Sequence, residues 1–179
     1  MKLLECHVDN FGKLSNYEYR FSESLTVIQE PNGFGKSTLV AFIKAMLYGL
    51  PRTAGRSVAG NERKKYLPWQ GGTYGGSLDF EFDGTAYRVW RTFGKTAAKD
   101  TFKLWDLTNR RESKQFSEKL GEELFQLDAE SFMRSVYMSQ SQNTDTTATT
   151  SIQAKLSNLV DNTDDLNNYD SAMERLRTA

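Results

Sequence analysis

Lys36 and Ser37 close a glycine-rich segment, residues 31–38, whose sequence is Pro-Asn-Gly-Phe-Gly-Lys-Ser-Thr. In such a turn several backbone N–H groups point at one anion, and the positive end of the following helix attracts the same anion. Lys36 then reaches the β and γ phosphates of a nucleotide, while the Ser37 hydroxyl binds Mg²⁺. The segment therefore predicts a phosphate-binding loop, with backbone donors at Gly33, Phe34, Gly35 and Lys36.

The sequence on both sides of this loop predicts the elements that such a loop requires. The run that begins at Leu25 is β-rich and mostly apolar, which predicts a buried strand before the loop. Apolar residues then recur at helical spacing as far as Tyr48, and Gly49 and Pro51 are expected to end this helix. The apolar helical positions are Leu39, Phe42, Ile43, Met46 and Leu47. This context favours a functional loop over a plain glycine-rich turn.

Glu30 departs from the full motif, which has glycine six positions before the lysine. A carboxylate at this edge repels a polyanion, so Glu30 is expected to weaken nucleotide binding unless its side chain points outward.

Composition limits the classes of protein to which this chain can belong. The 179 residues suffice for one domain, and 23 Lys and Arg against 23 Asp and Glu give no overall positive field, so any DNA contact must be local. Cys6 and His7 are the only cysteine and histidine, which excludes a disulfide or a Cys/His zinc site within one chain; both are expected in a strand. No apolar run approaches the about 20 residues of a membrane span, and no signal peptide is apparent, so a cytoplasmic location is expected.

Around the loop, the pattern predicts an α/β lobe over residues 1–142. Strands are expected at 3–8 and 17–21, joined at 10–13. Residues 50–65 are rich in Gly, Ser and basic side chains, which predicts an exposed, mobile loop; the alternative is a patch that contacts DNA phosphates. The basic residues of that loop are Arg52, Arg56, Arg63, Lys64 and Lys65.

An antiparallel β meander is predicted over residues 76–107. Leu78, Phe80 and Phe82 alternate with acidic residues, Asp83-Gly84 is a favoured hairpin turn, and return strands are expected at 87–93 and 102–107. The tryptophan and tyrosine residues of this region are expected in the core rather than in a base-stacking platform.

Two helices are then predicted, at 117–125 and at 128–136 with Asp128 as the cap of the second. The second helix leads to Gln140. Residues 143–150 form a Thr-rich polar linker, and residues 151–179 are expected to be helical. Apolar residues in that segment follow heptad intervals up to Ala179, which favours the root of a truncated coiled coil, with an ordinary surface helix as the alternative. The heptad positions are Leu166, Tyr169, Met173 and Leu176.

As an ordered set, these motifs resemble the N-terminal ATPase lobe of SMC-like proteins, a family that includes the SbcC- and YhaN-type ATPases. The resemblance is carried by Asn10-Phe-Gly12, by the phosphate loop, by the meander, and by the segment Ser131-Phe-Met-Arg-Ser-Val-Tyr-Met-Ser-Gln140. It implies that ATP and Mg²⁺ bind here and that Gln140 is the Q-loop glutamine, which contacts the metal or the attacking water. It also implies that Asn32, Thr38 and Lys13 lie near the phosphates.

The resemblance implies partners as well. The sequence has no apolar run followed by Asp-Glu and no Leu-Ser-Gly-Gly signature, and Tyr74-Gly-Gly-Ser77 enters a strand rather than a helix. In SMC-like proteins a C-terminal ATPase lobe and a second head supply those parts. The chain alone is therefore expected to bind ATP without turnover. The intact protein would act in double-strand-break repair or DNA processing, with DNA and an SbcD-type nuclease as partners and no membrane.

Three alternatives remain. A membrane-transporter ATPase subunit shares the fold, but there the signature directly follows the Q-loop. A GTPase is disfavoured because no Asn-Lys-X-Asp motif is present. A non-hydrolysing interaction module with a decayed loop is supported only by Glu30.

Overall fold

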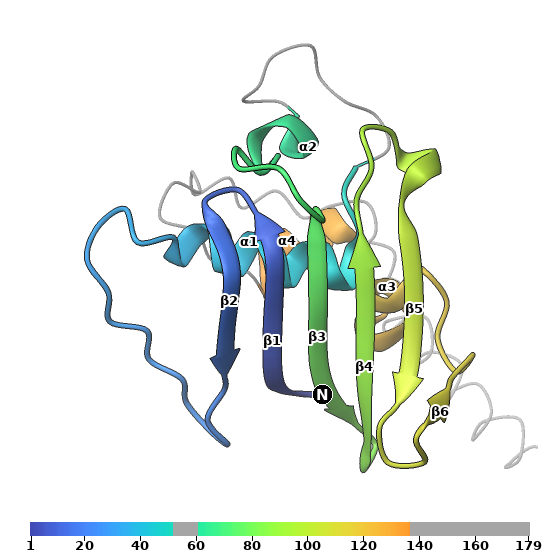
Figure 1. The fold of residues 1–179 in the computed structure, drawn as a ribbon. Helices are drawn as coiled ribbons and strands as arrows, with labels where there is room; N and C mark the ends of the chain where they lie inside the picture. The colour runs from blue at the N-terminus through green and yellow to red at the C-terminus, as the bar shows by residue number, and fades with distance from the viewer. Residues whose placement is uncertain (52–60, 137–179) are drawn as a thin grey trace, which may run out of the picture. The chain divides into compact units, whose positions relative to one another are not determined.

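The computed structural model describes residues 1–51 and 61–136, and its centre is a six-stranded antiparallel sheet (Figure 1). The strand order is β2-β1-β3-β4-β5-β6. The strands are β1 (Lys2–Phe11), β2 (Leu14–Arg20), β3 (Gly75–Phe82), β4 (Thr85–Thr92), β5 (Thr101–Asp106) and β6 (Arg111–Glu112). The helices are α1 (Lys36–Tyr48), α2 (Glu62–Lys65), α3 (Leu120–Phe125) and α4 (Ala129–Ser135), with a single 3-10 turn at Ala97–Lys99. The predicted meander is therefore confirmed.

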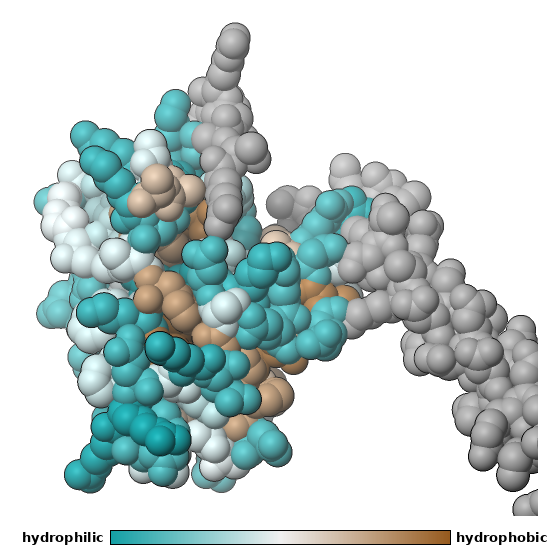
Figure 2. Space-filling view, turned by 90° about the vertical axis from the view of Figure 1, so that its right-hand side faces the viewer, coloured by the Kyte–Doolittle hydropathy of each residue, from teal (hydrophilic) through white to brown (hydrophobic). Residues whose placement is uncertain are grey.

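The core lies between α1 and one face of the sheet. From α1, Phe42 and Met46 are fully buried, and the sheet contributes Val8, Leu78 and Val89. Each such side chain contributes about 1.5–3 kcal/mol when it leaves water. The opposite face of the sheet is polar, as antiparallel sheets allow, because successive side chains point to opposite faces. Seen from the β5 and β6 side, hydrophilic residues cover most of the surface and apolar residues gather in patches between them (Figure 2).

Short-range signals predicted several elements correctly. Helix α1 covers 36–48 and ends at Gly49, whose φ of 74° few other residues adopt. The β3–β4 turn has φ values of 49° at Asp83 and 73° at Gly84, as a type I′ hairpin requires. Cys6 is buried in β1, and burial raises the pKa of its thiol to about 12. Within the described ranges, every helix is too short or too polar to serve as a membrane span.

The strand predicted from Leu25 is wrong. Residues 25–30 have no regular secondary structure, and the side chains of Leu25 and Val27 are 77% and 73% exposed. A strand requires a neighbouring strand to accept and donate its ladder hydrogen bonds. None of the described strands pairs with this segment, so Leu25 and Val27 stay exposed.

The expectation that the tryptophans are core residues is also wrong. Trp69 is 88% exposed, in the loop between α2 and β3, and Trp90 and Trp105 are 45% and 42% exposed. Trp90 alternates with the buried Val89 and Arg91, so it projects from the polar face of the sheet. Tyr74 and Tyr87, in contrast, are buried as expected.

Part of the basic segment 50–65 is not the loop that was predicted. Residues 61–65 enter α2, capped by the Asn61 side chain, which accepts a hydrogen bond from the Lys64 N–H at 3.1 Å. Arg63 is buried and donates two hydrogen bonds to the Asp100 carboxylate, at 2.7 and 2.9 Å. This pairing removes Arg63 from any DNA-contacting patch. Arg52 and Arg56 lie outside the described residues.

The described residues form two compact units, divided between Leu124 and Phe125. In the second unit, Asp128 caps α4 as predicted, since its carboxylate accepts from the Ser131 N–H at 2.7 Å. Helix α3 belongs mainly to the first unit and begins at Leu120, three residues later than predicted. Gln140, the linker and the segment at 151–179 lie outside the described residues, so what the sequence predicts for them remains a prediction.

Candidate functional site

The predicted phosphate loop leads directly into α1. Gly35 precedes the helix with a φ of 124° and makes no side-chain cap. A β-carbon at Gly35 would lie 3.0 Å from Leu14 Cδ2, so the position is restricted by space as well as by backbone conformation. Gly33 also has a positive φ, 81°, with open space around it. The first backbone N–H groups of a helix have no intrahelical acceptor, so the N-terminal end of α1 offers donors to an anion.

Lys36 is folded back across the loop. Its Nζ donates hydrogen bonds to the carbonyl oxygens of Glu30 and Pro31, the latter at 3.1 Å. These acceptors are neutral, so a phosphate oxygen with full negative charge would form the stronger hydrogen bond with the ammonium. Asn32 and Ser37 are exposed beside the lysine. The arrangement fits a triphosphate with Mg²⁺, because a cation, an accessible hydroxyl and the backbone N–H groups at the start of α1 occur within six residues of chain. Of the four predicted backbone donors, the Phe34 N–H already donates to the Pro31 carbonyl at 3.2 Å.

The turn between β1 and β2 lies against this loop. Lys13 is exposed, and its Cδ lies 3.6 Å from the position that a β-carbon at Gly35 would take. A β-carbon at Gly12 would lie 3.0 Å from Thr38 Cγ2. The structure thus brings Lys13 beside Gly35 of the phosphate loop, and Gly12 beside Thr38 at the end of that loop. Gln140 lies outside the described residues, so its place relative to the loop is still a prediction.

Glu30 is exposed, and its carboxylate acts on the phenol of Tyr17. The pKa of Tyr17 is raised, mainly by burial and further by nearby negative charges that include Glu30. Tyr17 in turn contacts Phe34 of the loop edge-on, with ring centroids 5.9 Å apart. Phe34 therefore anchors the loop on β2. The loop motif alone does not predict this packing role.

The other end of α1 is held by Arg91, which sequence reasoning missed. Its guanidinium donates hydrogen bonds to the carbonyl oxygens of Met46 at 2.8 Å, Leu47 at 3.4 Å and Glu118. The residue is 6% exposed, and burial lowers its pKa to about 10. Its guanidinium carbon lies 4.6 Å from the centre of the Phe102 ring. The available signal was its alternation with the buried Tyr87 and Val89.

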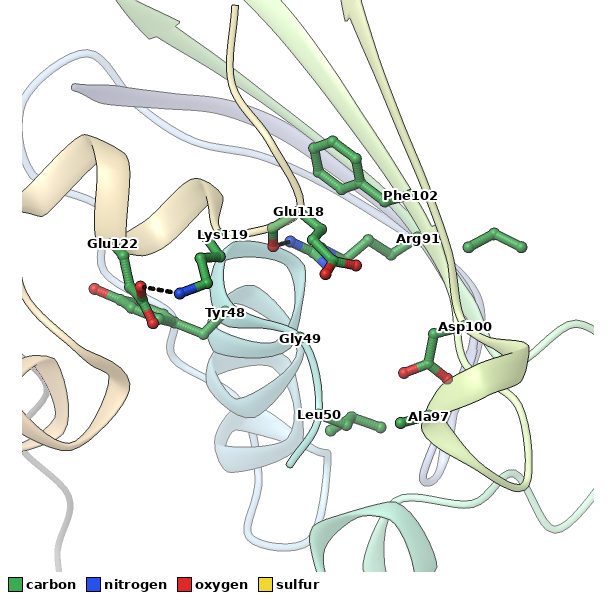
Figure 3. Close-up of a pocket in the computed structure, with 11 residues that line it drawn as sticks. Tyr48, Gly49, Leu50, Arg91, Ala97, Asp100, Phe102, Glu118, Lys119 and Glu122 are labelled. Atoms are coloured by element: carbon green, nitrogen blue, oxygen red, sulfur yellow. Dashed lines mark hydrogen bonds and ion pairs between the residues drawn. The ribbon is translucent and has the colours of Figure 1, made fainter. Parts of the chain in front are cut away.

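Arg91 lines a pocket of about 240 Å³, and Figure 3 shows it reaching from β4 towards the end of α1. Carbonyl groups in the last turn of a helix lack intrahelical donors and carry partial negative charge, so a buried cation satisfies them. Glu122 and Lys119 also line the pocket and form an ion pair at 3.2 Å. Both charge signs are present around the pocket, and Arg91 already donates to backbone oxygens. We interpret the hydrogen bonds of Arg91 in this pocket as the contact that holds the C-terminal end of α1 on the sheet. The position of α1 in turn determines where the phosphate loop lies at its N-terminal end.

We expect Arg91→Met to lower the free energy of unfolding by about 3 kcal/mol, because the carbonyl groups lose charged donors and stay buried. Urea denaturation followed by circular dichroism measures this. Arg20→Met is the matched control: its partner is Glu5, but the side chain is 84% exposed, so a much smaller loss is expected. Equal losses in the two variants would contradict the role assigned to Arg91.

Two comparisons with known proteins bear on this arrangement. A family model described as "AAA domain" matches residues 5–178. "Uncharacterized protein YhaN" of Bacillus subtilis (strain 168) is 39% identical over 82 residues, which are 45% of this chain. The matched region spans only 8% of the length of that relative.

Proposed function

Because the chain belongs to the AAA domain family, as the half of an SMC-like ATPase head that contains the phosphate loop, we propose that it binds Mg·ATP at residues 31–38. The observation that carries this proposal is the convergence of Lys36, Ser37 and the uncapped start of α1 on one exposed loop. Membership of this ATPase family implies that the chain binds a nucleotide. The choice of ATP rests on the absence of a guanine-reading motif from the sequence.

Each residue of the candidate site has a defined part in this proposal. Lys36 exchanges the carbonyls of Glu30 and Pro31 for phosphate oxygens and neutralises their charge. The backbone N–H groups of Gly33, Gly35 and Lys36 donate to the phosphates, with Asn32, Thr38 and Lys13 at the edge. The Phe34 N–H joins them by exchanging the Pro31 carbonyl, to which it donates at 3.2 Å, for a phosphate oxygen. Ser37 and Gln140 hold the metal, and Gln140 orients the attacking water.

The exposed segment that precedes the loop supports the view that this is one half of a larger ATPase head. Leu25 and Val27 are apolar and exposed, and no described strand pairs with them. Beside them an open groove of about 530 Å³ is lined by Ile28 and by Val40 and Ile43 of α1. We propose that the C-terminal ATPase lobe of the same protein covers this surface. Hydrolysis needs that lobe, so the chain alone would bind ATP without turnover.

For the intact protein we propose a role in DNA repair or DNA processing. ATP would join two heads and hydrolysis would separate them, which changes how the protein holds DNA; a nuclease of the SbcD type is a candidate partner. This proposal rests on the resemblance to SMC-like ATPase heads.

We expect titration calorimetry of the 179-residue chain to show saturable binding of Mg·ATP and weaker binding of Mg·GTP. Circular dichroism establishes that the sample is folded. A folded chain that binds neither nucleotide would refute the proposal for this chain. Phosphate release from the same sample is expected to stay at the level of the buffer.

A second candidate function, an interaction module whose loop no longer binds nucleotide, rests on Glu30 alone. Its carboxylate is exposed at the entrance of the loop. The variant Glu30→Gly separates the two candidates. Binding that appears only in this variant would favour the interaction module, whereas binding by the unaltered chain would exclude it.

A further inference from the structure

Trp69 is the most exposed of the large hydrophobic side chains in the described part of the chain, with 88% of its surface in contact with solvent. It lies in residues 66–73, which connect α2 to β3 and are called the tryptophan loop below. An indole held in water in this way loses the favourable free energy that burial of an aromatic ring provides. A loop that presents such a side chain is a candidate contact surface.

The tryptophan loop is attached at both ends to the turn between β1 and β2. The Gly12 N–H donates to the Tyr66 carbonyl at 2.7 Å, and the Asn10 Nδ2 donates to the Thr73 carbonyl at 3.1 Å. Gln70, next to Trp69, donates to the Asn10 Oδ1 at 3.2 Å. Figure 1 shows the loop that follows α2 lying over this turn. The position of Trp69 is therefore fixed relative to the hairpin.

The same hairpin turn lies against the phosphate loop. The Lys13 side chain lies beside Gly35, and Gly12 lies beside Thr38. The phosphate loop and the tryptophan loop therefore both contact this turn, at Gly12 in particular. A nucleotide anchored by its phosphates at residues 31–38 has its ribose and base left to extend over neighbouring surface, and Trp69 is exposed on that surface.

The other aromatic rings near the phosphate loop are already engaged. Phe34 contacts Tyr17, with 5.9 Å between ring centroids. Tyr66 stacks on Phe11 at 4.9 Å. Among the described residues, none forms a ring contact with Trp69, so both faces of its indole are accessible.

We propose that Trp69 stacks on the base of the nucleotide whose phosphates are held at residues 31–38. The inference rests on the nucleotide-binding function proposed above and adds the subsite for the base. Stacking on an aromatic side chain contributes about 1–3 kcal/mol per base and depends little on base identity, because every base has a π-face. Trp69 thus adds affinity for nucleotides in general, with purines favoured by their larger ring, and leaves base selection to other groups.

The experiment compares two ligands that differ in the base. Mg·ATP has a base, and Mg·tripolyphosphate has only the phosphates. By titration calorimetry, Trp69→Ala is expected to weaken Mg·ATP binding by about 5- to 150-fold, as 1–3 kcal/mol implies, and to leave tripolyphosphate binding unchanged. Trp69→Phe keeps a stacking face and should retain most of the affinity. Trp90→Ala is the matched control, since Trp90 is exposed on the polar face of the sheet and should have no effect.

A spectroscopic measurement tests the same contact without comparing affinities. The chain has three tryptophans, so the double variant Trp90→Phe, Trp105→Phe leaves Trp69 as the only indole. Mg·ATP is expected to change its fluorescence, and tripolyphosphate is expected not to.

The possible failures are distinguishable. Unchanged ATP affinity in Trp69→Ala would overturn the stacking subsite while nucleotide binding stands. An equal loss for both ligands would also overturn it, because Trp69 would then act on the phosphate loop through the hairpin. If the unaltered chain binds neither ligand, the proposed function itself fails and the subsite fails with it.

Discussion

Lys36→Ala is expected to weaken Mg·ATP binding by about 100-fold, or about 2.7 kcal/mol. The Nζ of Lys36 is the cation placed over the loop, where it donates to the carbonyls of Glu30 and Pro31. Its removal takes away a charged donor to the β and γ phosphates, and a charge-assisted hydrogen bond of this kind contributes about 1.5–3 kcal/mol. Titration calorimetry of the folded variant measures the loss.

Two further variants make the result specific. Lys103→Ala removes an exposed lysine of β5 and should leave the affinity unchanged. Lys13→Ala is expected to have a smaller effect than Lys36→Ala, because Lys13 lies at the edge of the loop rather than in it. An unaltered affinity in Lys36→Ala would place the nucleotide elsewhere and would contradict the site.

Gly76→Ala is expected to lower the free energy of unfolding by at least about 4 kcal/mol. Gly76 sits in the middle of the sheet, paired with Val8 on one side and Arg91 on the other. A β-carbon there would lie 2.1 Å from the carbonyl oxygen of His7, which is a backbone atom and cannot move without displacing β1. Separation of the strands adds an overpacking cost to the unfavourable φ of 157°.

Gly84→Ala is the control for backbone conformation alone. Its φ is 73°, and a β-carbon would meet nothing within 4 Å, so a loss of about 1 kcal/mol is expected. Urea denaturation gives both values. Domains of this size are stable by about 5–15 kcal/mol, so Gly76→Ala would remove between about a quarter and most of the stability. A Gly76→Ala protein as stable as Gly84→Ala would show that β1 and β3 do not pair as described.

Sequence reasoning succeeded where the determining residues are close together in the chain. The start of α1 at the phosphate loop, its end at Gly49, the Asp83-Gly84 turn and the Asp128 cap each depend on a few neighbouring residues. Such signals are local, because turn conformation and capping are decided within one turn of chain.

Features that depend on distant partners were missed. Leu25 looks like a strand residue, but whether it is one depends on a neighbouring strand that the described chain does not supply. Arg63 looks like a surface residue, and its burial is explained by its pairing with Asp100 and its hydrogen bond to the Gly94 carbonyl at 2.9 Å. Arg91 is similar, since its acceptors lie about 45 residues before it and 27 residues after it. For the candidate site, the motif predicted the loop residues, whereas the place of Lys13 and the exposure of Trp69 required the fold.

The pairing of β1 with β3 has a consequence for the order in which the parts of the protein fold. Lys2 pairs with Glu81 and Leu3 with Phe80, so this ladder closes a loop of chain that contains the phosphate loop and all of α1. Closing so long a loop costs entropy before any contact compensates for it, which slows folding. During synthesis β1 and β2 emerge before β3, so the hairpin that they form has an unpaired edge at β1 until β3 arrives. The phosphate loop is therefore synthesised before β3, and the core between α1 and the sheet is complete only after β3 has paired with that edge.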